Sequence, residues 1–305
     1  MRKRILITGS NGLLGQKLIK ALAPKHVVLA TSKGPCRILH KKGFEYKELD
    51  VTEKIAVKQL ITDFRPDAVI NTAAMTNVDA CEEQTAACDQ LNVLAVQYLA
   101  NACLSVKAHL LHLSTDFIFD GEDGPYKEED QANPISYYGL SKWRSEQILQ
   151  NHDCDWTVLR TIIVYGIADD LSRGNIVLWG RGALKKQEPL NIIDDQYRSP
   201  TLAEDLAEAC LLVIEKKALG VYNASGKDIM SIFEMIQRMA DFYKCDKSII
   251  NRISTATLNQ RAKRPPKTGF ILDKAITQLG YKPHSFEEGL AIIEQQILKQ
   301  ENQSN

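Results

Sequence analysis

The chain has 305 residues, 44% of them hydrophobic and 25% charged, which is typical of a globular protein with a sizeable core. Its 38 basic and 38 acidic residues cancel, so no overall field favours nucleic acid or an anionic membrane, while a small anionic ligand remains compatible with this balance. The chain has no apolar run of the roughly 18–20 residues that a membrane span needs, and its seven cysteines have no C-x-x-C spacing. Because the N-terminal residues lead directly into a strand-like run, we expect no targeting segment. These features predict a cytoplasmic protein with reduced thiols that binds neither nucleic acid nor membrane.

The first half of the chain alternates short apolar runs with amphipathic segments. The expected strands are 4–8, 26–31, 45–50, 68–71, 109–114 and 157–161. The expected helices are 13–22, 54–64, 84–104 and 136–150. Strands that alternate with helices of this length predict an α/β fold, here a Rossmann-type doubly wound parallel sheet with helices on both faces.

After Gly166 the pattern changes. The expected elements are a helix at 174–186, a strand at 190–193, a helix from Thr201 to about 216, a strand at 221–224, a helix from about 231, a basic loop at 261–267 and a last helix at 286–299 before a frayed tail. Thr201 and Glu204 have the spacing of a capping box.

Two domains follow from this division. We expect residues 1–165 plus about 194–225 to form the dinucleotide-binding domain, and about 166–193 plus 226–305 to form a smaller, discontinuous C-terminal substrate domain. The smaller domain is expected over the carboxyl edge of the sheet, where open α/β sheets bind their ligands.

A glycine-rich turn, T-G-S-N-G-L-L-G, joins the first strand to the first helix. Glycines at this spacing allow a tight turn, close approach of the backbone to a pyrophosphate, and tight helix–strand packing, with the helix N-terminus facing the phosphates. The alternative is a simple turn with a packing glycine. The residues predicted to hold a dinucleotide here are Gly9, Asn11, Gly12, Leu13, Leu14 and Gly15.

The end of the second strand indicates which nicotinamide cofactor is used. An NAD site usually has an acidic residue there, but this strand runs into Ser32 and Lys33, and no acid occurs before Glu45. A hydroxyl and a cation, with Arg37 close behind, suit a 2′-phosphate. We therefore expect NADPH, with NADH as the second choice; the alternative is that Lys33 and Arg37 are solvated loop charges.

Two further segments are expected to touch the cofactor. Asp50 and Val51 close the third strand, where they can meet the adenine, although Asp50 equally suits a cap for the following helix. Small residues after the fourth strand allow the backbone to approach the cofactor, which assigns Ala73, Ala74 and Thr76 to the same site.

The catalytic residues are expected around S-T-D-F-I-F-D-G, residues 114–121. Tyr138 and Lys142 follow in a predicted helix, and residues four apart share one helix face. A nearby cation lowers the pKa of a phenol towards neutral pH, where proton transfer to a carbonyl oxygen is efficient. We predict Tyr138 as the proton donor in reduction, Lys142 as the group that holds the nicotinamide ribose and lowers the pKa of the phenol, and Thr115 as the hydrogen-bond donor to the substrate oxygen.

Several alternatives stay open around these residues. Ser114 competes with Thr115 as the hydroxyl donor. Tyr137 is a second phenol, but its partner four residues on is Ser141, which indicates a packing role or a wall of the substrate site. Asp116 either orients the loop, contacts a sugar hydroxyl, or has a structural role in a turn.

Cations in the second half are candidates for binding a diphosphate. Arg198, Arg264 and Lys267 carry suitable side chains, and the alternative for each is ordinary surface charge. None of the six histidines falls into a metal-ligand spacing, so we expect them to be structural.

Together these motifs resemble the extended short-chain dehydrogenase/reductase superfamily and, within it, the dTDP-4-dehydrorhamnose reductase family. The resemblance spans nearly the whole chain and rests on TGSNGLLG, NTAAMTNVD, STDFIFDG, YYGLSK, RTIIVYG, DQYRSPT and RPPKTGFILD. It implies reduction of the 4-keto group of a dTDP-activated 6-deoxyhexose with NADPH or NADH, giving dTDP-L-rhamnose. It places the catalytic triad on Thr115, Tyr138 and Lys142.

The chain departs from the family pattern at the substrate side. Ile163 stands where members commonly have a Trp in the sugar pocket, and Arg198 where many have Gly. Some members bind magnesium at a dimer interface through a Glu at the position of Lys17, so we predict no metal here, while a homodimer stays open. Phe117 replaces the Glu of related dehydratases and argues against dehydration.

The resemblance also implies an alternative to catalysis. A eukaryotic branch of the family acts as a regulatory subunit of methionine adenosyltransferase. The competing hypotheses are therefore an NADP-binding regulatory subunit without turnover, or a reductase of another nucleotide sugar.

Overall fold

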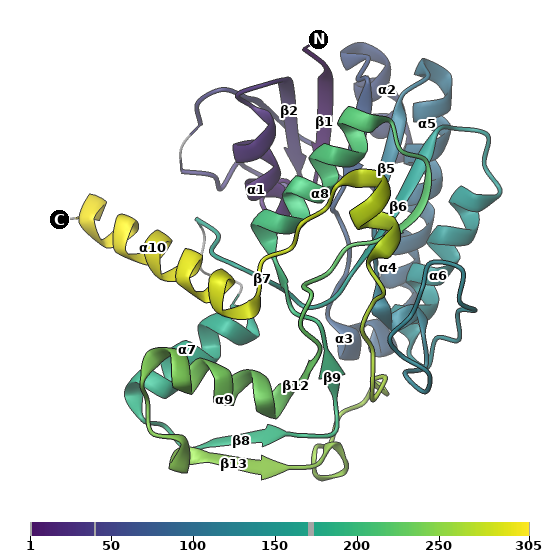
Figure 1. Ribbon diagram of the computed structural model, residues 1–305. Coiled ribbons are helices and arrows are strands. Elements are labelled where there is room, and N and C mark those ends of the chain that lie inside the picture. Colours follow the sequence, from purple (N-terminus) through teal and green to yellow (C-terminus); the bar gives the residue numbers. More distant parts are fainter. Residues whose placement is uncertain (1, 40, 170–173, 305) are drawn as a thin grey trace.

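The centre of the structure is a seven-stranded parallel sheet (Figure 1). This computed structural model describes residues 2–39, 41–169 and 174–304. The strand order is β11–β6–β5–β4–β1–β2–β3. The order therefore reverses between the neighbouring strands β1 and β4. A reversal of this kind marks the ligand-binding edge of a doubly wound sheet, which confirms the predicted fold. The strands are β1 (Arg4–Thr8), β2 (Val27–Ser32), β3 (Glu45–Glu48), β4 (Ala68–Asn71), β5 (His109–Thr115), β6 (Trp156–Thr161) and β11 (Gly220–Asn223).

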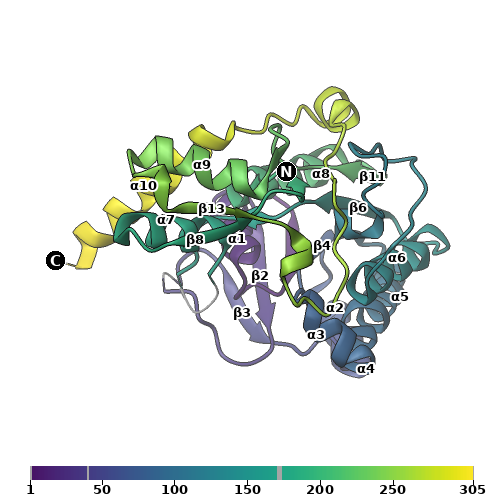
Figure 2. The same cartoon turned by 90° about the horizontal axis from the view of Figure 1, so that it is seen from below.

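Helices cover both faces of this sheet because its strands are apolar on both sides. Along β1, Ile5 and Ile7 pack with one hydrophobic core, and Leu6 packs with the other. The first core contains α1 (Leu13–Leu22) and α8 (Ala203–Lys216). The second contains α2 (Lys54–Phe64), α5 (Ala95–Val106) and the end of α6 (Tyr137–Gln150). Figure 2 shows the two helical layers on either side of the strands.

The segment expected as one helix over 84–104 is divided into several pieces. The structure has α3 (Val78–Glu83), which was not predicted, then α4 (Thr85–Asp89), a π-helical turn at Gln90–Leu94, and α5. The wide turn carries the buried Asn92, whose side chain bonds the backbone N–H and C=O of Met75 at 2.8 and 3.0 Å. These bonds fix the loop after β4, which explains why the regular helix is interrupted there.

A smaller group of elements lies below the carboxyl edge of the sheet in Figure 1. Its core is formed by apolar faces of three helices, which contribute residues such as Val177, Met235 and Leu290. These helices are α7 (Ile176–Lys186), α9 (Ile232–Tyr243) and α10 (Phe286–Ser304). Short strand pairs complete it: β8 (Leu190–Ile193) with β13 (Ile250–Ile253), and β9 (Tyr197–Arg198) with β12 (Met230–Ser231). The predicted domain boundaries stay a prediction.

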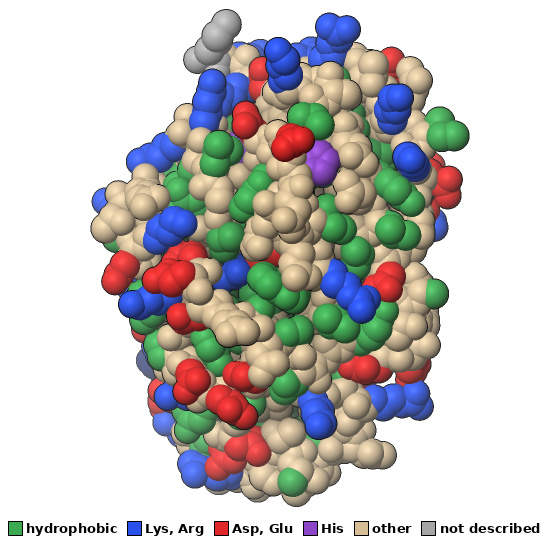
Figure 3. Space-filling view, turned by 90° about the vertical axis from the view of Figure 1, so that its right-hand side faces the viewer, with side chains coloured by type: hydrophobic (Ala, Val, Ile, Leu, Met, Phe, Trp, Pro, Cys, Tyr) green, Lys and Arg blue, Asp and Glu red, His purple; other side chains and the backbone are tan. Residues whose placement is uncertain are grey.

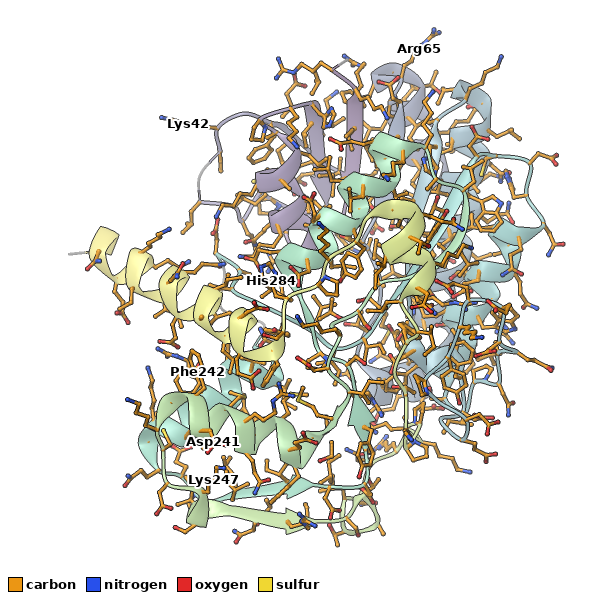
Figure 4. The ribbon with its side chains drawn as sticks, viewed as in Figure 1. Lys42, Arg65, Asp241, Phe242, Lys247 and His284 are labelled. Carbon is orange, nitrogen blue, oxygen red and sulfur yellow. The ribbon has the colours of Figure 1, made fainter. Side chains whose placement is uncertain are left out.

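A hydrogen-bonded histidine joins the two groups of elements. His284, labelled in Figure 4, lies just before α10, and its Nδ1 atom is 2.6 Å from Oδ1 of Asp205 on α8. The backbone N–H of His284 also donates to this carboxylate, at 2.9 Å. These bonds attach the start of α10 to α8 of the large sheet layer. Helix α10 continues to Ser304, beyond the expected end at 299.

The predicted capping box at Thr201 is wrong. Helix α8 begins at Ala203, and Leu202 precedes it without a side-chain cap. Thr201 belongs instead to β10 (Thr201–Leu202), which pairs with β7 (Val164–Tyr165), and its hydroxyl donates to the carbonyl of Ile162 at 2.6 Å. Glu204 forms an ion pair with Lys17 at 2.8 Å rather than closing a capping box.

The surface carries both signs of charge. In Figure 3, Lys and Arg side chains lie among Asp and Glu side chains over the face shown, in keeping with a formal net charge of zero. Within the described ranges, no helix has both the length and the hydropathy to cross a membrane.

Candidate active site

Two of the three predicted glycines are required by the packing of the turn itself. Gly9 has a φ of +69°, and a Cβ atom there would lie 2.7 Å from Oγ1 of Thr72 and 2.8 Å from the backbone nitrogen of Ala73. A Cβ atom at Gly15 would lie 2.5 Å from Cα of Ser10. Neither position can accept a side chain, because the turn packs closely against the loop after β4 at Gly9, and α1 packs closely against the turn at Gly15.

Gly12 differs, because the protein itself leaves space beside it. A Cβ atom at this residue would approach only the carbonyl oxygen of Gly9, at 3.2 Å. Gly12 is the N-cap of α1 and supplies no side-chain cap. The first N–H groups of α1, at Leu13 and Leu14, therefore face the open space beside Gly12, which we call the cofactor cradle. A side chain at residue 12 would narrow this space. This arrangement fits the pyrophosphate of a dinucleotide.

Neighbouring polar side chains hold the glycine turn in place. The backbone N–H of Asn11 donates to Oγ of Ser32 at 2.9 Å, and the Asn11 side chain donates to the carbonyl of Pro35 at 2.9 Å. Ser32 is buried beneath the turn. Both residues therefore brace the phosphate loop against the end of β2, where the adenosine end of a dinucleotide lies in this fold.

Lys33 and Asp50 meet at the same edge of the sheet. Nζ of Lys33, a side chain that is 83% exposed, lies 2.8 Å from Oδ2 of Asp50. Burial acts to raise the pKa of the Asp50 carboxyl, but hydrogen bonds from Lys33 and Thr52 outweigh it and leave the pKa lowered. Asp50 does not cap α2, whose N-cap is Glu53; its Oδ1 accepts from the N–H and hydroxyl of Thr52 at 3.0 and 2.7 Å. Val51 beside it is buried.

The loop after β4 runs alongside the glycine turn. The N–H of Ala73 donates to Oδ1 of Asn71 at 3.2 Å, which holds the loop close to Gly9. Ala73 and Ala74 are half-buried and Thr76 is exposed. The small side chains leave the backbone of this loop accessible from the side of the cofactor cradle.

The structure brings Thr115 and Tyr138 together. Thr115 ends β5 and Tyr138 is in the first turn of α6, which begins after the N-cap Ser136. The Thr115 side chain lies close enough to the phenol to act to lower its pKa, while its hydroxyl donates to Oδ1 of Asp116 at 3.1 Å. Burial is the larger effect, so the pKa of Tyr138 is raised. The ring of Phe117 meets that of Tyr138 edge to face, with the centroids 5.7 Å apart.

A glycine sets the distance between these two elements. A Cβ atom at Gly139 would lie 2.0 Å from the carbonyl oxygen of Phe117. Helix α6 therefore contacts the backbone of the loop after β5 directly, next to the predicted catalytic residue Tyr138. Any larger residue would force the helix away from Thr115.

Lys142 lies one turn further along α6 and is 2% exposed. Its Nζ atom is 2.9 Å from Nε2 of His112 on β5. Burial lowers the pKa of Lys142 to about 8. Burial raises the pKa of Tyr138, against the expected fall towards neutral pH, and the role of the Lys142 ammonium in lowering this pKa stays a prediction.

The two competing hydroxyl groups are engaged elsewhere. Ser114 donates to Oε1 of Glu146 at 2.5 Å and is buried. Tyr137 donates to Oδ2 of Asp89 at 2.8 Å, on the outer side of α6. Neither oxygen is positioned beside the Thr115–Tyr138 pair.

Asp116 and Arg198 are buried and hold a loop. Asp116 accepts a hydrogen bond from Thr268 at 2.5 Å, and burial raises its pKa even though Arg198 lies close. The Arg198 guanidinium donates to the carbonyls of Tyr197 and Pro265, both at 2.7 Å, and its Nε is 3.6 Å from Asp116. These bonds occupy its donors, so Arg198 braces the basic loop rather than offering its charge to a diphosphate.

The remaining predicted substrate residues lie on two loops. Arg264 is tied to Asp79 at 2.7 Å, and the exposed Lys267 follows it. Ile163 adopts a φ of +33°, which is rare for a β-branched residue. Its carbonyl accepts from the N–H of Thr201 at 3.0 Å, and its side chain packs against two of the hydrophobic cores. Such strain concentrates at binding sites.

The motifs assembled here are matched by a known family over almost the whole chain. The model of the RmlD substrate binding domain matches residues 2–298. The chain belongs to the RmlD substrate binding domain family. The family predicted from the sequence is thereby confirmed.

Relatives of this RmlD family member carry several different names, and two of them bear on its function. A dTDP-4-dehydrorhamnose reductase of Aggregatibacter actinomycetemcomitans is 31% identical, over 95% of this chain and 98% of that protein. A methionine adenosyltransferase 2 subunit beta of Xenopus tropicalis is 32% identical, over 83% of this chain and 75% of that protein. Among solved structures, a dTDP-4-dehydrorhamnose reductase of Bacillus anthracis in complex with NADP has a TM-score of 0.83 and 26% identity, over 97% of this chain and all of that one.

At the position of Lys17, this RmlD family member has an internal ion pair. Nζ of Lys17 lies 2.8 Å from Glu204 and 2.9 Å from Oε1 of Gln296 on α10. With the Lys17 ammonium bonded to it, the Glu204 carboxylate does not fit the role of a metal ligand. In the described ranges, no group of three or more His, Cys, Asp or Glu side chains is arranged to hold a metal ion.

Sequence reasoning missed three residues that shape the site in this RmlD family member. Thr268 bonds Asp116, and Asn71 and His112 form a buried chain to Lys142. A signal for His112 was present: His112 and Ser114 alternate along an apolar strand, so both side chains face α6, where the polar residues Lys142 and Glu146 are also four apart. Polar residues on two facing buried surfaces indicate a network.

Proposed function

We propose that the protein reduces the 4-keto group of a nucleotide-activated 6-deoxy sugar with NADPH, in the manner of a dTDP-4-dehydrorhamnose reductase that gives dTDP-L-rhamnose. One observation carries the proposal. Thr115, Tyr138 and Lys142 lie together at the carboxyl edge of the sheet that also holds the uncapped glycine turn. The support from relatives is the named reductase that aligns over 95% of this chain.

The cofactor site favours NADPH, with NADH as a second choice. Asn11, Gly12 and the first turn of α1 would hold the pyrophosphate, and Lys33 is exposed at the end of β2, where a 2′-phosphate belongs. A solved relative contains NADP. When bound, the dinucleotide supplies the hydride for the reduction.

The protein's own residues provide the proton and orient the carbonyl. Burial raises the pKa of Tyr138, so the phenol keeps its proton at neutral pH and has it available for the substrate oxygen. The Thr115 hydroxyl, which donates to Oδ1 of Asp116 at 3.1 Å in the structure, would turn to donate a hydrogen bond to the same substrate oxygen. Lys142 lies one turn along the helix and holds the nicotinamide ribose.

Substrate recognition is assigned to the surrounding loops. Thr115, the last residue of β5, and Asp116 and Phe117, which follow it, would contact the sugar together with Ile163. Arg264 and Lys267 supply charge for the diphosphate, and Arg198 positions the loop that carries them. The resemblance implies a dTDP nucleotide.

The test is the loss of reduced nicotinamide absorbance when NADPH and dTDP-4-dehydrorhamnose are added, with the product identified by mass. We expect turnover, with NADPH preferred over NADH. The Tyr138→Phe variant is expected to lose about 10²–10⁴-fold in kcat, the usual contribution of a general acid. Tyr137→Phe, which removes the neighbouring phenol that bonds Asp89, is the matched control and is expected to retain turnover. A Tyr138→Phe variant with wild-type kcat would contradict the catalytic assignment.

The similarity to methionine adenosyltransferase 2 subunit beta keeps a second candidate, an NADP-binding regulatory subunit. It predicts that the protein binds NADPH but does not oxidise it with the keto sugar. It also predicts a stable complex with a methionine adenosyltransferase catalytic chain in size-exclusion chromatography. Turnover of the sugar without such a complex would exclude it.

A further inference from the structure

A chain of four buried polar side chains ends at the amine of Lys142. Asn71 on β4, His112 on β5, and Ser145 and Lys142 on α6 are each at most 2% exposed. We call Asn71, His112 and Lys142 the relay cluster. Their hydrogen bonds are few and well defined, so the position of each proton can be worked out.

The orientation of the Asn71 amide is set first. Oδ1 of Asn71 accepts from the backbone N–H of Ala73 at 3.2 Å and from the hydroxyl of Thr8 at 2.6 Å. A backbone N–H is always a donor, so the oxygen must lie on that side. The Nδ2 group, which only donates, therefore points at Nδ1 of His112, 3.0 Å away.

The imidazole proton then lies on Nε2. Nδ1 of His112 must accept from Asn71, so it carries no proton and the ring is neutral. Burial, with the charge of Lys142 as the second cause, also holds the pKa of His112 well below the usual value. On the other side of the ring, Nε2 is 3.0 Å from Oγ of Ser145, whose own proton goes to the carbonyl of Lys142 at 2.6 Å. Ser145 therefore accepts, which also requires the proton on Nε2.

Lys142 consequently faces a donor rather than an acceptor. Its Nζ atom is 2.9 Å from the same Nε2. An ammonium has three donors and no acceptor, so it cannot bond an N–H group. A neutral amine can accept from it, sharing the single Nε2 proton with Oγ of Ser145. The hydrogen-bond pattern thus stabilises the deprotonated form of Lys142.

We propose that Asn71 and His112 are positioning residues that fix the imidazole tautomer and thereby make the Lys142 proton exchangeable during turnover. This proposal rests on the proposed reductase function for its catalytic meaning. Reduction consumes the Tyr138 proton once per cycle, and a lysine whose neutral form is stabilised gives up a proton more readily than an ordinary one. The burial of Lys142, which lowers its pKa to about 8, acts in the same direction.

Other charges around Lys142 act in the opposite direction. Glu146 on α6 and Cys88 on α4 both raise the pKa of Lys142. Glu146 is itself paired with Arg160 on β6 at 2.8 Å and accepts from Ser114 on β5, so much of its charge is compensated. Tyr138, one turn earlier on α6, is the remaining titratable group on this face.

The first experiment does not depend on catalysis. In protein with ¹⁵N-labelled histidine, long-range ¹H–¹⁵N spectra are expected to show His112 neutral, with its proton on Nε2; loss of the signal in His112→Gln assigns it. The side chain of Lys142, labelled with ¹³C at Cε and assigned with Lys142→Met, is expected to titrate near pH 8. A proton on Nδ1, or a Lys142 that titrates at the usual value of about 10.4, would overturn the proposal.

A single substitution can reverse the pattern. Asn71→Asp replaces the donor by an acceptor of nearly the same shape, so Nδ1 should gain the proton and Nε2 should accept from the ammonium. We expect the tautomer to switch and the proton affinity of Lys142 to rise at least tenfold. Asn92→Asp is the matched control, because Asn92 is equally buried near the site but bonds Met75 and Ser141 instead of His112. The control should keep the Nε2 tautomer and move the Lys142 titration less.

The catalytic arm uses the keto-sugar assay. In Asn71→Asp the alkaline limb of the kcat profile is expected to move upward by at least one pH unit, with the KM for NADPH changed less than kcat. A switched tautomer with an unmoved alkaline limb would overturn the role in turnover. If the wild type shows no turnover, the reductase proposal fails, and the spectra still decide the tautomer. If Asn71→Asp does not fold, the wild-type spectra alone decide it.

Discussion

Arg160 and Lys142 are two buried basic side chains with partners on α6 and β5 respectively, and they differ in the kind of partner that each one has. Arg160 on β6 forms a bidentate pair with Glu146, with bonds of 2.8 to 3.2 Å, and Glu146 also accepts from Ser114. We call Arg160, Glu146 and Ser114 the anchor cluster. Lys142, one turn before Glu146 on the same helix, has a neutral imidazole beside its amine.

The difference shows which cation is structural. A buried guanidinium with a bidentate carboxylate keeps its charge at any pH near neutral, and breaking such a pair is costly. A buried amine without a carboxylate in contact holds its proton weakly, which suits a group that exchanges protons. The anchor cluster holds β5, β6 and α6 together, and the relay cluster uses that rigid frame.

The largest expected effect separates the two cations by stability. Arg160→Met leaves Glu146 buried without its partner and is expected to lower the free energy of unfolding by about 3–5 kcal/mol. Lys142→Met removes an amine with no ion pair, so the free energy of unfolding should change by less than about 1.5 kcal/mol while turnover is lost. Urea denaturation of both variants measures this. Equal destabilisation by the two substitutions would remove the distinction between the clusters.

A second pair of substitutions tests the two hydroxyls at the end of β5. Thr115→Val is expected to lower kcat by about 10²–10³-fold, the usual effect of losing one donor to the developing oxyanion. Ser114→Ala removes a donor to Glu146 and should cost about 1–3 kcal/mol of stability with kcat nearly unchanged. Steady-state kinetics and urea denaturation of both proteins give the answer. A large loss of kcat in Ser114→Ala would move Ser114 from the anchor cluster into the catalytic site.

The stability at acid pH gives a third case, the buried imidazole of His109, whose Nε2 contacts a hydroxyl and not a charged side chain. Burial lowers the pKa of His109 to about 4, and its Nε2 is 2.8 Å from Oγ1 of Thr157. His109 binds a proton near pH 6.5 in the unfolded chain and only near pH 4 in the folded chain. The contribution of the neutral His109 to the free energy of unfolding is therefore complete above pH 6.5 and is lost as the pH falls towards 4. The loss is up to about 3 kcal/mol. Urea denaturation at several pH values measures it, and His109→Gln should reduce the slope. An equal slope in the variant would assign the effect to other groups.

The smallest effect is expected at the exposed ion pair beside the cofactor site. Lys33→Ala removes a cation that is 83% exposed and paired with Asp50. Solvent screens such a charge, so the KM for NADPH should rise by about fivefold or less, with the KM for NADH unchanged. Steady-state kinetics with both cofactors test this. An equal rise in both KM values would mean that Lys33 does not distinguish the 2′-phosphate.

Much of the first half could be predicted from the sequence because its strands are continuous apolar runs between amphipathic helices. The expected and observed bounds agree at 4–8, 13–22, 54–64 and 68–71. The two-residue strands β7, β9, β10 and β12 are too short to show any alternation. The role of Thr201 depends on a strand partner 37 residues earlier, at Val164, which no local pattern contains.

In the candidate site, too, features with a local sequence pattern could be predicted, and features that depend on distant segments could not. Thr115, Tyr138 and Lys142 stand in a motif with a fixed spacing, so the sequence pointed to them. The hydrogen bonds of Arg198 could not be predicted, because they go to carbonyls of Tyr197 and Pro265 that fold around it. The alternation of His112 with Ser114 was a signal for a buried network, but the tautomer of His112 could not be predicted, because residues on two other elements decide it.

The contact at Gly139 has a consequence for how such a protein diverges. The first turn of α6, which carries Tyr138, rests on the main chain at Phe117, in addition to the edge-to-face contact between the two rings. Substitutions elsewhere leave this main-chain contact in place as long as residue 139 remains a glycine. Under the proposed function, new sugar preferences could then arise on the outlying loops around Ile163 and Arg264 without moving Tyr138.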